Sequence, residues 1–89
     1  MSYNFVVQAN CEKEMDKFSK KNPVLKEALR RKMKEIIENP SHYKPLMHDL
    51  AGERRVHIMK SFVLKFVIAD NTKTVTFFFF GHHDDAYKR

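Results

Sequence analysis

Basic and imidazole side chains gather in one stretch in the second half of the chain. Twelve consecutive residues without a carboxylate contain Arg54, Arg55, His57, Lys60 and Lys65. Lysine and arginine supply the positive charge that binds phosphates, and histidine gains or loses a proton near neutral pH. We therefore expect a cationic surface that binds a phosphate backbone and leaves the attached bases accessible.

The end of the chain carries a second polar cluster, which follows four consecutive phenylalanines and reads Gly81-His82-His83-Asp84-Asp85-Ala86-Tyr87-Lys88-Arg89. Either histidine is suited to general acid and base catalysis. On an extended segment, adjacent histidines point to opposite sides, and their spacing matches no specific metal-site pattern. We therefore expect no metal and no cofactor. The spacing alone leaves open both an acid/base site and a polar tail without function.

The first half of the chain predicts one short strand and two helices. Apolar and polar residues alternate over residues 3–7, the period of a strand. Asn10 is expected to cap a first helix. Asn22-Pro23 is a second helix start, and apolar residues then recur every three or four positions as far as Asn39-Pro40, where that helix stops.

The second half predicts a meander of three strands at residues 54–59, 62–68 and 74–80, with a hairpin turn at 70–73. The whole chain therefore forms one α+β domain over residues 1–89, in the order β-α-α-β-β-β. We expect an antiparallel-rich sheet with a helical hairpin packed on one face.

The strand period also assigns faces. Arg55, His57 and Lys65 are expected to share one face, opposite a core-facing set formed by Val56, Ile58, Leu64 and Phe66. The four phenylalanines at 77–80 cannot all face the core on a strand of period two. Two of them must lie on the other face, where a partner covers them or they form an exposed apolar patch.

Composition limits the classes of protein that fit. The 89 residues include 17 Lys and Arg against 11 Asp and Glu, a net charge of +6 that favours a polyanionic partner. A hydrophobic content of 43% excludes a disordered basic tail. Cys11 is the single cysteine, so we expect no internal disulfide and a reducing compartment. With neither a membrane-spanning run nor a signal peptide in the pattern, we expect a cytoplasmic protein that binds no membrane.

Several segments together resemble the RelE/ParE superfamily of toxins from type II toxin–antitoxin systems. They are the helical hairpin, the segment at residues 45–52, the strands at 54–58 and 62–68, and the ending Gly81-His82-His83 with Tyr87. The resemblance covers essentially the whole chain, and the RelE-type mRNA interferases are the nearest subgroup.

The resemblance implies a toxin that cleaves mRNA in the ribosomal A site and so inhibits translation. It also implies a cognate antitoxin as partner, in a toxin–antitoxin heterotetramer. Cleavage would proceed by attack of the ribose 2′-hydroxyl on the adjacent phosphate. This chemistry needs a proton acceptor, cations beside the phosphorane and a proton for the leaving oxygen, and it needs no metal.

By resemblance, the catalytic set is His83, Lys65, Arg55 and Tyr87, with His83 in the acid/base role and Tyr87 stacking on a base. The expected RNA- and phosphate-binding set is Arg54, His57, Lys60 and His82. Family members carry a phosphate-binding arginine at the position of Val63, and Lys65 or Lys60 is the expected substitute. Another branch uses a glutamate where this chain has Lys44.

The departure at Val63 keeps two alternatives open. One is a ParE-type toxin, which binds DNA gyrase and cleaves nothing itself. The other is a catalytically weakened homologue that binds RNA or its antitoxin without cutting.

Overall fold

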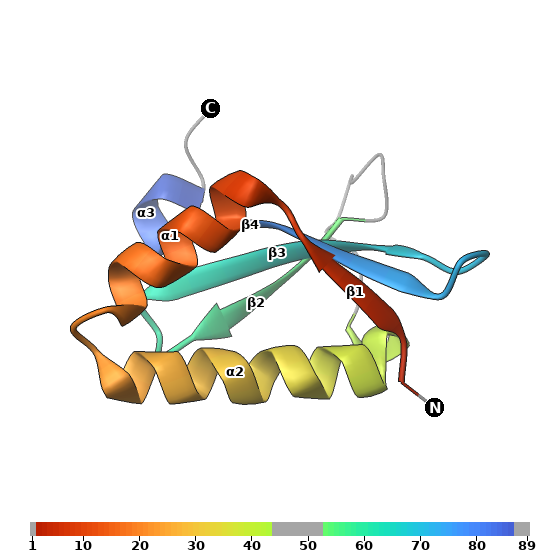
Figure 1. The fold of residues 1–89 in the computed structure, drawn as a ribbon, viewed down its shortest axis with the longest axis horizontal. Helices are drawn as coiled ribbons and strands as arrows, with labels where there is room; N and C mark the ends of the chain where they lie inside the picture. The colour runs from red at the N-terminus through yellow and green to blue at the C-terminus, as the bar shows by residue number, and fades with distance from the viewer. Residues whose placement is uncertain (1, 44–52, 87–89) are drawn as a thin grey trace.

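A computed structural model describes residues 2–43 and 53–86 of the chain (Figure 1). The elements, in chain order, are β1 (Asn4–Val7), α1 (Ala9–Ser19), α2 (Pro23–Glu38), the 3-10 helix η1 (Pro40–His42), β2 (Arg54–Ile58), β3 (Phe62–Ala69), β4 (Thr74–His82) and α3 (His83–Ala86). The expected α+β class and element order are confirmed, with η1 and α3 as additions. No helix in the described residues is long and apolar enough to cross a membrane.

The four strands form one mixed sheet in the order β1-β4-β3-β2. The pairs β2–β3 and β3–β4 are antiparallel, which confirms the expected meander, and β1 lies parallel to β4 at the edge. The helices α1 and α2 run in opposite directions along the sheet (Figure 1). Both helices pack on the same sheet face, because their buried residues share one core cluster with the strands.

The two main helices begin differently. At α2, the Asn22 side chain accepts a hydrogen bond from the Leu25 N–H at 3.1 Å and Pro23 follows, as the sequence predicts. The prediction that Asn10 caps α1 is wrong, because α1 begins at Ala9 with Gln8 as its N-cap and no side-chain bond. The reason is tertiary: the Gln8 N–H donates to the Phe77 carbonyl at 2.9 Å, so the sheet fixes the residue from which the helix starts.

The strand with four phenylalanines departs from a strict period of two. Lys65 pairs with Phe79 but the next residue, Phe66, pairs with Phe77, which leaves Phe78 as the extra residue of a β-bulge. The bulge places both Phe77 and Phe80 in the core, where they are 0% and 1% exposed. A regular strand would have turned these two side chains to opposite faces.

Strand ends also differ from the prediction, and β3 continues to Ala69 rather than stopping at residue 68. β4 continues through His82 rather than stopping at residue 80, because Gly81 pairs with Val63 and His82 with Phe62. β2 ends at Ile58 rather than 59, because Met59 has a positive φ of 53° that leaves the strand conformation.

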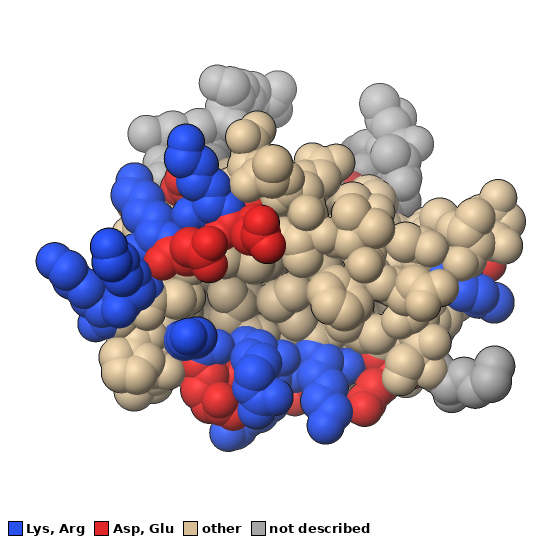
Figure 2. All heavy atoms as spheres, in the orientation of Figure 1, with Lys and Arg blue, Asp and Glu red and all other residues tan. Residues whose placement is uncertain are grey.

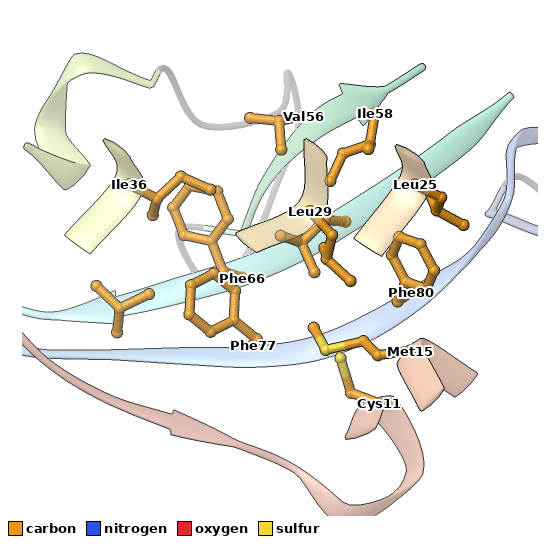
Figure 3. Close-up of a cluster of buried hydrophobic side chains, with 12 residues drawn as sticks. Cys11, Met15, Leu25, Leu29, Ile36, Val56, Ile58, Phe66, Phe77 and Phe80 are labelled. Carbon is orange, nitrogen blue, oxygen red and sulfur yellow. The ribbon is translucent and has the colours of Figure 1, made fainter. Parts of the chain in front are cut away.

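The hydrophobic core lies between the helices and one face of the sheet (Figure 3). Cys11 and Met15 come from α1, and Leu25, Leu29 and Ile36 from α2. They meet a strand layer that contributes Val56, Ile58, Leu64, Phe66, Val75, Phe77 and Phe80. No described side chain in the core is polar or charged, so burial of apolar area is the main force that holds the helices on the sheet.

Candidate functional site

The sheet face opposite the core carries the basic residues that the strand period assigned to it. Arg55 on β2 lies directly across from Lys65 on β3, and His57 lies across from Val63. Since paired residues share a face in an antiparallel ladder, the expected common face of Arg55, His57 and Lys65 is confirmed. Val63 also lies on this face but is fully buried. An apolar side chain therefore occupies the position at which the resembling family carries an arginine.

One end of this face is hollowed. A depression of about 370 Å³, which we call the histidine hollow, is lined by His57, Lys60, Ser61, His82, His83 and Asp84. The His57 and His83 rings lie 5.5 Å apart between centroids, with 31° between their planes. Two residues that are 26 positions apart in the sequence therefore present their imidazoles together.

The turn between β2 and β3 forms one wall of the histidine hollow. Met59 and Lys60 both have positive φ, 53° and 66°, and the Ser61 N–H donates to the Met59 carbonyl at 2.6 Å. The His83 N–H in turn donates to the Ser61 carbonyl at 2.7 Å, which ties the start of α3 to this turn. The main chain thus holds Lys60 and His83 at the same hollow.

Lys65 and Arg55 lie on the same face but do not line the hollow. The Lys65 ammonium is 3.7 Å from a Glu53 carboxylate oxygen and 5.2 Å from the centroid of the Phe79 ring. Its side chain is only 18% exposed. The carboxylate-free interval in the sequence is therefore not free of carboxylates in space, because Glu53 reaches Lys65 from just before the strand.

Arg54 and His82 lie apart from that face. Arg54 pairs with Phe66 on the core side, and its Nε donates to the Tyr43 carbonyl at 2.6 Å. His82 reaches the rim of the hollow, but its ring stacks on Phe62 at 4.7 Å and meets Phe18 edge-on at 5.1 Å. Tyr87 and Lys44 lie outside the described residues.

The charges at the histidine hollow are mixed. The His83 Nδ1 lies 3.7 Å from an Asp84 carboxylate oxygen, and the two form an ion pair when His83 is protonated.

Along α2, basic and acidic side chains lie side by side at the lower edge of Figure 2, with Glu27 bridging Arg30 at 2.7 Å and Arg31 at 3.6 Å. The helix surface is therefore a solvated face of paired charges.

The described residues offer neither a metal centre nor a thiol nucleophile. Within 2–43 and 53–86, no group of three or more His, Cys, Asp or Glu side chains could hold a metal ion. Burial raises the pKa of the Cys11 thiol to about 11, with a smaller contribution from Glu12. Cys11 is thus protonated at neutral pH and enclosed in the core. The reactive groups in this part of the chain are imidazoles and cations.

The predicted site set lacked four residues that the structure places there: Ser61 and Asp84, which line the hollow, and Glu53 and Phe79, which contact Lys65. Ser61 lines the hollow, and its carbonyl accepts the hydrogen bond from the His83 N–H. The short gap between the two predicted strands was the signal in the sequence for a turn at this position. Phe79 supports Lys65 from the neighbouring strand. Nothing in the local pattern could have shown this, because the contact depends on the bulge at Phe78.

Residues 9–87 match the family described as ParE toxin of type II toxin-antitoxin system, parDE. A protein of Methanocaldococcus jannaschii named "Putative toxin RelE4" is 45% identical over 87 residues, which cover 98% of this chain and 93% of that protein. An uncharacterised protein of Methanosarcina mazei is 36% identical over 85 residues, covering 96% of this chain and 99% of that protein.

Two solved structures share the fold at 20% sequence identity each. One is the toxin–antitoxin complex RelBE2 from Mycobacterium tuberculosis, with a TM-score of 0.74 and coverage of 93% of both chains. The other is a metal-bound toxin from Helicobacter pylori, with a TM-score of 0.73 and coverage of 96% of this chain and 99% of that one.

Proposed function

Because the chain belongs to the ParE toxin family, within the RelE/ParE superfamily of type II toxin–antitoxin systems, we propose that this toxin is an endoribonuclease that cleaves mRNA at the histidine hollow. The observation that carries the proposal is the His57–His83 pair, 5.5 Å apart beside Lys60. Two groups that exchange protons and one cation match the requirements of 2′-hydroxyl attack on a phosphate.

The geometry limits where the phosphate lies. The two imidazoles face each other with only 31° between their planes, and their separation leaves no space for a phosphate between the rings. We therefore propose that the scissile phosphate binds across the ring edges, beside Lys60, which lines the same hollow. One imidazole accepts the 2′-hydroxyl proton, the other donates a proton to the leaving 5′-oxygen, and Lys60 stabilises the charge of the phosphorane.

Arg55 and Lys65 then bind the flanking backbone. They lie one pair of residues farther along the same face than His57 and Val63, a spacing of about 7 Å by strand geometry. Glu53 and the Phe79 ring hold the Lys65 side chain in place, so Lys65 positions RNA rather than transferring protons. Tyr87 remains our expected base-stacking residue from the family resemblance.

Primer extension on a translated message tests the proposal, with wild type compared with His57→Ala, His83→Ala and Lys60→Ala. Loss of one general acid or base is expected to slow cleavage by about 10²- to 10⁴-fold. His42→Ala is the matched control, because this exposed histidine contacts Tyr43 and is absent from the lining of the hollow. Unchanged cut sites and rates in both His57→Ala and His83→Ala would remove these residues from the mechanism.

A gyrase inhibitor is the second candidate, and the match to a family described by the ParE toxin favours it. The absence of the strand arginine, with Val63 fully buried in its place, also favours it. Supercoiling assays with DNA gyrase separate the two functions, since an mRNA interferase leaves gyrase activity unchanged. Inhibition of gyrase without RNA cleavage would select the second candidate.

We propose a cognate antitoxin protein as the physiological partner, forming a toxin–antitoxin heterotetramer, with mRNA and the ribosome as the targets in the cytoplasm. Support comes from the family and from the fold shared with the RelBE2 complex. Co-expression with the product of the neighbouring reading frame should restore growth to cells that produce the toxin. A toxin that arrests growth equally with that product present would contradict the pairing.

A further inference from the structure

His82 ends a stack of aromatic rings that begins in the core. The Phe80 and Phe62 rings are 5.4 Å apart and almost parallel, with 5° between their planes. The Phe62 and His82 rings are 4.7 Å apart, with 27° between their planes. Phe80 is 1% exposed, whereas His82 is exposed, so the stack opens to solvent at the imidazole.

The same stack is held from the side by α1. The Phe18 ring meets Phe80, Phe62 and His82 edge-on, at centroid distances of 6.1, 5.2 and 5.1 Å. Offset-stacked and edge-on contacts of this kind stabilise ring orientation beyond area burial alone. The His82 imidazole is therefore oriented before any ligand binds, which lowers the entropy cost of stacking a further ring on it.

The position of His82 relative to the histidine hollow follows from the end of β4. His82 pairs with Phe62 on the core side, whereas His83 contacts His57 on the opposite face. Neighbouring residues at a strand end thus project to two sides, and both line the rim of one hollow. A nucleotide presents its base and its phosphate in a similar way, on two sides of the ribose.

We propose that His82 is a stacking platform for an unpaired RNA base, and that the RNA backbone crosses the end of β4 so that the adjoining phosphate lies in the histidine hollow. The inference rests on the proposed function and adds a base-binding subsite to it. Since a base in a duplex has both faces covered by its neighbours, this subsite selects single-stranded RNA.

Binding of short RNAs tests the subsite. The probes are hexanucleotides with 2′-O-methyl groups, which lack the attacking hydroxyl and are not cut, carrying 2-aminopurine or an abasic residue at each position in turn. At one position we expect wild type to quench 2-aminopurine fluorescence. His82→Ala should weaken binding of the intact RNA by about 5- to 150-fold, the range that corresponds to stacking of one base.

The second measurement combines the protein and RNA changes. The abasic residue should weaken binding to wild type by a similar factor and produce no further loss with His82→Ala, because both changes remove the same contact. His82→Phe, which keeps a ring against Phe62, should retain the affinity and the quenching. His42→Ala serves as the control for loss of one exposed histidine.

The outcomes separate this inference from the function on which it rests. Additive losses from His82→Ala and the abasic residue at every position would overturn the stacking role while leaving RNA binding in place. Equal losses in His82→Ala and His82→Phe would also overturn it, since a ring alone would then be insufficient. Wild type that binds none of the RNAs would overturn the base-binding subsite, whereas the proposed function is tested separately by primer extension on a translated message.

Discussion

Lys60 lies in the turn that forms one wall of the histidine hollow, and its backbone is left-handed, with a φ of 66°. In this conformation, an L-residue destabilises the folded state by about 1–2 kcal/mol relative to glycine. Glycine in turn lowers the free energy of unfolding by about 0.4–1 kcal/mol, because the unfolded chain with glycine has more conformational freedom. Lys60→Gly should therefore stabilise the fold by about 0.5–1 kcal/mol. For a domain of this size, that gain raises the Tm by about 2–8 °C.

The same change removes a cation from the hollow. The slope of log binding constant against log salt for single-stranded RNA should become shallower by about 0.7, the value for one lost phosphate contact. Lys60→Gly is thus expected to raise the Tm while lowering RNA affinity. Thermal unfolding by circular dichroism and RNA titration at several salt concentrations measure the two effects on one preparation.

Lys73→Gly is the matched control. Lys73 also has a positive φ, 51°, and lies at the opposite end of β4 from the hollow. Its ammonium is 5.4 Å from the Tyr3 ring centroid, so the gain in Tm should be smaller than for Lys60→Gly, with RNA affinity less affected. A lower Tm in Lys60→Gly would refute the strain argument, and an unchanged salt slope would refute the phosphate contact.

Three further predictions concern the fold. Folding raises the pKa of Cys11 from 9.0 to about 11. The stability that this shift contributes is therefore full below pH 9 and is lost as the pH rises toward 11. The free energy of unfolding in denaturant should decline over this range, and the decline should be smaller in Cys11→Ala. Asn22→Ala should lower the free energy of unfolding by about 1 kcal/mol through loss of the cap of α2, and Asn22→Asp should restore it in the same assay. Gly81→Ala should lower the Tm, because its Cβ would lie 3.1 Å from the tip of the Phe79 ring, which must then shift by a few tenths of an ångström. An unchanged or higher Tm would show that the ring yields freely.

The elements that local chemistry controls were predictable from the sequence. Asn22-Pro23 starts α2 as expected, since an N-cap and a proline at the first position act on the nearest turn of the chain. The face shared by Arg55, His57 and Lys65 follows from the strand period together with the apolar residues that alternate with them. The superfamily could be recognised for the same reason, because its features lie in the order of segments along the chain.

The start of α1 and the end of β4 were not predictable in this way. The hydrogen bond from Gln8 to Phe77 decides the first, and pairing with Phe62 and Val63 decides the second. Both depend on residues more than fifteen positions away, where a local pattern carries no information.

The candidate site likewise depends partly on the sequence alone and partly on the tertiary structure. The sequence by itself determined which chemical groups exist, namely histidines and cations with a single thiol, and which sheet face most of them share. Only the tertiary structure decided that His57 and His83 meet beside Lys60, that Lys65 is held by Glu53, and that Arg54 turns to the core side. The physical reason is that distance between side chains is set by strand pairing, turns and the bulge, which join segments distant in the chain.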